Sequence, residues 1–194
     1  MTTPSDPLDA VRNWYLATKE VAKVLTRLGG RYWDALPDDH PISQDETFKK
    51  YKTGAELVGK AEKVVAAEVL DDAAVLLLFA AFEGELRTLV ALDVRDELAR
   101  LPAKSLLRHT LGDLQQRAER GSVAALIEHY GPVDPELVGR VKELRQYRNG
   151  LVHGRHPLRR GHPQPTPEAV HTLLSKLLTV ITARRSAAPP GVTT

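Results

Sequence analysis

Three helices are each expected to begin at a capping residue followed directly by proline: Asp6-Pro7, Asp134-Pro135 and Thr166-Pro167. Asp and Thr side chains accept hydrogen bonds from the free N–H groups of a helix's first turn, and proline suits the first helical position because it has no N–H. Apolar residues recur three or four positions apart after each pair, and after the first pair they are Leu8, Val11, Tyr15, Val21, Leu25 and Leu28. The pattern predicts amphipathic helices over residues 6–28, 134–153 and 166–185.

Two further helices are expected between the first pair and the second. Residues 44–68 regain a helical period, despite Gly54 and Gly59, through Phe48, Tyr51, Ala55, Val58 and Val65. Residues 71–100 form a strongly apolar helix that ends before Pro102 and is typical of the centre of a bundle. Its apolar residues narrow to a stripe of Phe79, Phe82, Leu86 and Val90. Glycines divide residues 104–131 into short helices.

No segment alternates with the period of two that marks a strand. We therefore expect an all-α, up-and-down bundle of four long helices with short accessory helices. At 194 residues the chain suits one domain over residues 1–185, followed by a disordered tail at 186–194.

Composition limits the binding partners and the cellular location that we expect for the chain. The 27 basic and 25 acidic residues leave a net charge of only +2, so attraction for nucleic acid must be local. The absence of cysteine excludes disulfides, and no export signal is visible, which predicts a cytoplasmic protein. The longest apolar run, residues 73–82, is half the ~20 residues that span a bilayer, so no membrane segment is expected.

Arg148 interrupts the apolar face of the helix at residues 134–153. On a helical wheel it lies at the centre of the face formed by Leu137, Val141, Leu144, Leu151 and Val152. A charge there requires a partner, a wet cleft or a protein–protein interface, unless its stem packs while the guanidinium reaches solvent. Glu83 interrupts the stripe of the preceding long helix in the same way, so we expect it to pair with Arg148, as a structural ion pair or as support for a site.

His153 lies five residues beyond Arg148, about 140° around an ideal helix. The two side chains therefore converge only if the helix end distorts or a second subunit contributes; otherwise His153 simply caps the negative end of the helix dipole. A basic patch surrounds these two residues, and its members are Arg140, Lys142, Arg145, Arg148, Arg155, Arg159 and Arg160. The patch either binds a phosphate backbone or is simply a charged, solvated segment.

The string Tyr147-Arg148-Asn149-Gly150-Leu151-Val152-His153-Gly154 resembles the signature of the HEPN superfamily. The Phe82-Glu83 pair on the preceding helix is similar to a pattern in bacterial families such as the RiboL-PSP-HEPN group. The resemblance covers roughly residues 45–185.

The resemblance implies a homodimer in which two motifs face one cleft and cut RNA without metal or other cofactor. Arg148 and His153 would be catalytic, Asn149 and Glu83 would support them, and RNA would contact Arg145, Arg155, Arg159 and Arg160. Many bacterial relatives are toxins or defence effectors held in check by an antitoxin or regulatory protein. One branch is silenced at a Tyr shortly after the His, but Gly154, Arg155 and His156 follow here.

Three other interpretations stay open. The same fold is also used for binding RNA or a regulatory protein without cleavage. The second interpretation is a metal site at His153, His156 and His162, although their spacing matches no recognised metal motif and no carboxylate lies nearby in the sequence. The third interpretation is that the motif is a chance feature of a helical scaffold.

Overall fold

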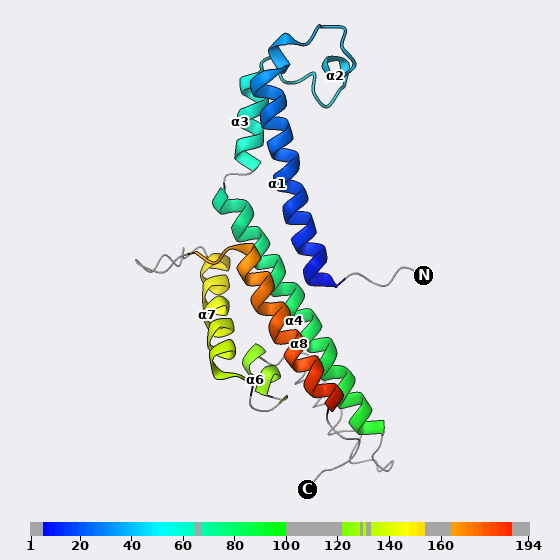
Figure 1. Ribbon diagram of the computed structural model, residues 1–194, viewed down its shortest axis with the longest axis vertical. Helices are drawn as coiled ribbons and strands as arrows, with labels where there is room; N and C mark the ends of the chain where they lie inside the picture. The colour runs from blue at the N-terminus through cyan, green and yellow to red at the C-terminus, as the bar shows by residue number, and fades with distance from the viewer. Residues whose placement is uncertain are drawn as a thin grey trace. The chain divides into compact units, whose positions relative to one another are not determined.

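The computed structural model describes residues 6–64, 67–99, 122–128, 130, 133–153 and 164–187 (Figure 1). Every regular element in these ranges is helical. The long helices are α1 (Pro7–Arg31), α4 (Ala67–Ala99), α7 (Pro135–Val152) and α8 (Pro167–Ala187). This confirms the predicted all-α helical bundle with four long helices and shorter additions. No helix in the described ranges is both long enough and apolar enough to cross a membrane.

The predicted cap-plus-proline starts are present at three of the long helices. In each case the capping side chain accepts a hydrogen bond from a backbone N–H of the first turn. The acceptors and donors are Asp6 and Leu8 (2.9 Å), Asp134 and Glu136 (3.0 Å), and Thr166 and Ala169 (3.3 Å). Local chemistry therefore determines where α1, α7 and α8 begin.

The chain divides into two compact units. The first contains Met1–Asp9 and Val75–Thr194, and the second contains Ala10–Ala74. A single domain over residues 1–185 stays a prediction, since α1 and α4 each contribute residues to both units. Helix α8 extends to Ala187, and the rest of the predicted tail lies outside the described residues.

The core of the first unit is aliphatic and aromatic. Helix α4 buries Phe79, Phe82 and Leu86 on one stripe, as its apolar pattern predicts. Figure 1 shows α8 running beside α4, and α7 packs against α8. The buried residues of these two helices are Leu137, Val141, Leu144, Val170, Leu173, Leu174, Leu177 and Ile181. A short helix, α6 (Val123–Glu128), precedes α7, while most of the predicted short helices at 104–131 lie outside the described residues.

The second unit corrects the predicted helix at residues 44–68. A short helix, α2 (Pro41–Gln44), ends at Asp45, whose backbone is extended and whose carboxylate accepts the N–H of Thr47 (2.7 Å). This local turn competes with a helix, and the hydrogen bond lowers the pKa of Asp45. The helical chain resumes only at α3 (Gly54–Val64), where the Thr53 hydroxyl accepts the N–H of Glu56 (3.3 Å).

The core of the second unit is small. Tyr15 is fully buried against Leu70 and Ala74, and its hydroxyl donates to Asp71 (2.7 Å). Trp33, in the 3₁₀ helix η1 (Trp33–Ala35), packs near the ring of Phe48, with centroids 5.8 Å apart. Helices α1 and α3 approach closely where they carry glycine, because a Cβ on Gly54 would lie 2.1 Å from the carbonyl oxygen of Gly29.

One residue of the predicted apolar face of α1 is misplaced. Val21, expected to be inside, is 58% exposed, and the neighbouring Ala22 is buried instead. A helix turns 100° per residue, so adjacent positions at the edge of an apolar stripe exchange places with a small rotation. Hydrophobic spacing alone does not fix that rotation.

Candidate active site at the end of α7

Arg148 continues the inward face of α7. It follows the buried Val141 and Leu144 along the same side of the helix, one turn beyond Leu144. Its side chain keeps 30% of its exposure, so the guanidinium lies at the edge of the core and not within it. The wheel position is as predicted, and the charge reaches both protein partners and solvent.

Glu83 is the principal partner of this guanidinium. Nη2 of Arg148 donates to Oε2 of Glu83 over 3.0 Å, and the Glu83 side chain is 20% exposed. Glu83 follows the buried Phe82 on α4, so the first unit's core holds its backbone in place. The contact predicted from two interrupted apolar stripes is therefore present between residues that are 65 positions apart.

Two more groups fix the guanidinium plane. Nη1 of Arg148 donates to Oδ1 of Asn149 over 2.9 Å. The central carbon of the guanidinium lies 5.5 Å from the centroid of the Phe79 ring, a cation–π distance. The sequence analysis did not assign Phe79 to the site. Phe79 precedes Glu83 by one helical turn on the same stripe, so helical spacing could have identified it as a neighbour of Glu83. The two hydrogen bonds use two of the five N–H donors of arginine.

His153 ends the helix. It is the C-cap of α7, with φ −93° and ψ 11°, and its backbone N–H donates to the carbonyl of Asn149 (3.1 Å). The residue is exposed, and within the described residues no hydrogen bond or ion pair joins its imidazole to Arg148. Among the described residues, a single chain therefore joins Arg148, Asn149 and Glu83 by hydrogen bonds that do not include the His153 side chain.

The remaining predicted contacts fall partly outside the described residues. Arg145 is half-buried on α7, whereas Arg155, Arg159 and Arg160 are not described, nor are His156 and His162. Val152 was predicted on the inward face but is 59% exposed, because α7 ends at this residue. Among the described residues, no group of three His, Asp or Glu side chains is arranged to hold a metal.

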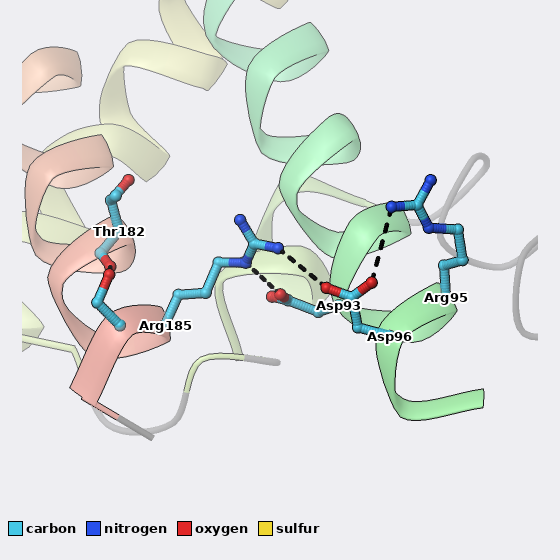
Figure 2. Close-up of polar contacts among 6 residues, drawn as sticks. Asp93, Arg95, Asp96, Thr182 and Arg185 are labelled. Atoms are coloured by element: carbon cyan, nitrogen blue, oxygen red, sulfur yellow. Dashed lines mark hydrogen bonds and ion pairs between the residues drawn. The ribbon is translucent and has the colours of Figure 1, made fainter. Parts of the chain in front are cut away.

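A second polar cluster joins the far ends of α4 and α8. Figure 2 shows Arg185 of α8 facing Asp93 and Asp96 of α4, with Arg95 beside Asp96. Nε of Arg185 donates to Asp93, and its Nη2 lies 3.5 Å from Asp96. Arg185 thus links α8 to α4, whereas Arg95 pairs with its neighbour Asp96 within α4, and we call this cluster the clamp.

Tyr130 adjoins this clamp. Burial, together with the neighbouring Asp93 carboxylate, raises the pKa of its phenol. The Tyr130 carbonyl accepts a hydrogen bond from Arg184 (3.2 Å), which ties the segment before α7 to α8. The pairing of Asp93 with Arg185 spans 92 positions, and neither residue interrupts an apolar stripe, so no pattern in the sequence marked it.

No family model matches the chain, and no curated protein or solved structure is significantly similar to it.

Proposed function

We propose that this chain is a HEPN-type endoribonuclease that cuts RNA without a metal at a site formed between two copies. The observation that carries the proposal is the held guanidinium of Arg148, which contacts Glu83, Asn149 and the ring of Phe79 while still partly exposed. A structural ion pair needs only one carboxylate. A cation fixed on three sides at the surface end of a helix is suited to meeting an anion.

The role proposed for Arg148 is to bind the scissile phosphate. Arginine does not act as a base at ordinary pH, but its free donors stabilise charge that builds on the phosphoryl oxygens. Glu83 and Asn149 act as positioning residues, since they hold the guanidinium and do not touch the reacting atoms. Fixing these donors before the substrate arrives avoids reorganisation during the reaction.

His153 supplies the proton transfers in this proposal. An imidazole takes or gives a proton near neutral pH. His153 of one subunit removes the proton of the ribose 2′-hydroxyl as the 2′-oxygen bonds to phosphorus. His153 of the partner subunit donates a proton to the 5′-oxygen as the phosphorus–oxygen bond breaks. The products are a 2′,3′-cyclic phosphate and a 5′-hydroxyl, and no oxidant or reductant is needed.

The geometry at the end of α7 supports the proposal of two copies. Arg148 and His153 point about 140° apart on an ideal helix, and His153 is exposed. A second chain that packs against this end would bring another His153 toward Arg148. The exposed Val152 beside it provides apolar surface for such a contact.

The proposed RNA contacts outside the reacting atoms are Arg145, Arg155, Arg159 and Arg160. Four arginines within residues 145–160 of the sequence attract a phosphate backbone even though the net charge of the chain is only +2. A cytoplasmic toxin or defence effector, controlled by an antitoxin or regulatory partner, is the biological role that we propose for such an enzyme.

The second candidate is an RNA-binding or regulatory module that does not cut. It is favoured by the position of His153, whose imidazole has no partner among the described residues to orient it. In that case Arg148 would still bind phosphate, and binding would weaken with salt.

The two candidates are separated by incubating the protein with RNA in EDTA and identifying the ends of any fragments. Fragments with 2′,3′-cyclic phosphate and 5′-hydroxyl ends support the nuclease. Intact RNA from pH 6 to 8, with salt-dependent binding retained, supports the binding module and contradicts the nuclease. A reaction that needs added metal contradicts the proposed mechanism.

A further inference from the structure

Within the second unit, a groove between α1 and α3 has a basic wall. Its volume is about 650 Å³. The wall consists of Lys23, Arg27 and Arg31, all exposed on α1. These cations recur every four residues, so they follow one another along the helix at ~6 Å intervals.

The rest of the groove leaves these cations accessible. Ala22, Gly30 and Ala61 line it without long side chains, and Thr26, which also lines it, is half-buried. Glu62 is the acidic residue among the lining side chains. The lining therefore carries three positive charges against one negative charge.

Intramolecular pairing does not account for these charges. Lys23 pairs with Glu20 over 2.7 Å, but both side chains are about two-thirds exposed, and such surface pairs are weak. Arg27 and Arg31 form no ion pair with any residue in the described ranges. Arg31 lies in the last turn of α1, where the helix dipole favours a cation, but Arg27 and Lys23 lie before that turn.

An exposed aromatic residue follows the basic wall. Tyr32 comes directly after Arg31 at the end of α1 and is 54% exposed. Proteins that bind single-stranded nucleic acid combine a positive groove along the backbone with aromatic rings on which bases stack. Tyr32 does not line the groove but directly follows the last of its cations in the chain. A row of cations followed by an exposed ring fits a polynucleotide better than a small anion, which occupies one cation, or an acidic peptide, which gains little from the ring.

We propose that this groove binds single-stranded RNA, with Lys23, Arg27 and Arg31 on successive phosphates and Tyr32 under a base. The inference deepens the proposed function, on which its choice of RNA rests, by giving the enzyme a second RNA contact, in the second unit.

The test uses the full chain with His153→Ala, so that RNA stays intact, and a fluorescein-labelled single-stranded RNA. Binding is followed by fluorescence anisotropy from about 50 to 200 mM salt, a range in which phosphate contacts change affinity strongly. Arg27→Gln with Arg31→Gln is compared with Lys49→Gln with Lys52→Gln, which removes the same charge from exposed sites outside the groove. Circular dichroism checks that the variants are folded.

The groove variant is expected to bind roughly tenfold more weakly and to lower the salt slope by about 1.4, since each phosphate contact on a single strand contributes ~0.7. The control pair should bind as the parent does. Tyr32→Ala should weaken binding by roughly fivefold, whereas Tyr32→Phe should not, because stacking needs the ring and not the hydroxyl.

Equal binding by the groove and control variants overturns this inference. If the wild-type chain still cleaves RNA in that case, the proposed nuclease stands without the groove. If the wild-type chain does not cleave but the groove variant loses affinity, the groove stands and the nuclease fails.

Discussion

The guanidinium of Arg148 on α7 and the carboxylate of Glu83 on α4 are joined by a 3.0 Å hydrogen bond between residues that each interrupt an apolar stripe. The pair connects the helix that carries the proposed motif to the central helix of the first unit. It serves both the stability of that unit and the orientation of Arg148.

Removing Glu83 should therefore destabilise the protein and impair the site. Glu83→Ala leaves the cation without its carboxylate and should lower the free energy of unfolding by about 1–2 kcal/mol, less than the ~3–5 kcal/mol of a fully buried pair, because solvent reaches both side chains. Urea denaturation of Glu83→Ala, Arg148→Ala and the double variant measures the coupling. Glu85→Ala, two residues along the same helix, is the control. Additive effects of the two substitutions would contradict the pairing.

The close approach of α1 and α3 makes a second prediction. Gly29→Ala would place a Cβ 2.7 Å from the Gly54 carbonyl oxygen, so the helices must separate, and stability should fall by about 1–3 kcal/mol. Gly59→Ala is the matched control on α3, since nothing lies within 4 Å of its Cβ, and it should raise stability by about 0.5–1 kcal/mol through helix propensity. Thermal unfolding of both variants tests this. The same effect at the two glycines would argue against the helix contact.

The cap of α7 should be measurable on its own. Asp134→Ala removes the acceptor of the Glu136 N–H and should cost about 1 kcal/mol of unfolding free energy. Asp134→Asn keeps a capping oxygen and should be close to the parent. Denaturation at neutral pH compares the three proteins, and an equal loss for Ala and Asn would show that charge, not capping, is the source.

Tyr130 should make the folded protein less stable as the pH becomes alkaline. Its pKa is raised by burial and by Asp93, so the phenol stays protonated to a higher pH in the folded protein than in the unfolded chain. The unfolded chain ionises this group above pH ~10, and stability therefore falls as pH rises beyond that value toward the folded pKa. Tyr130→Phe should be less stable near pH 7 by about 0.5–1.5 kcal/mol, and the difference should shrink above pH ~10. Parallel stability curves across that range would refute the shift.

Much of the fold was predictable because its signals are local. The residue pairs Asp6-Pro7, Asp134-Pro135 and Thr166-Pro167 start helices as expected, through hydrogen bonds within one turn. The turn at Asp45 was missed, since an apolar period continues across it while a side-chain hydrogen bond stops the helix. The spacing of apolar residues also does not determine how a helix is rotated about its axis, as the exposed Val21 shows.

The candidate site was also only partly predictable from the sequence. Arg148 and Glu83 could be paired from the sequence because a charge on an apolar face requires a partner. The Phe79 ring and the Asp93–Arg185 clamp depend on how the helices pack, and a charge on a polar face does not indicate which partner it meets. The approach of His153 to Arg148 requires a second chain in our proposal, and no pattern within one chain specifies that geometry.

The central claim is tested most directly by RNA cleavage rates in EDTA for matched pairs of variants. Arg148→Ala is paired with Arg12→Ala, which removes an exposed arginine outside the basic patch, and His153→Ala is paired with the exposed Gln146→Ala. If His153 transfers protons, His153→Ala should slow cleavage by about 10²–10⁴-fold. Arg148→Ala should also lose most activity, and both controls should cleave as the parent does. Cleavage that survives in His153→Ala, or that is lost equally in a variant and its control, would contradict the proposed enzyme.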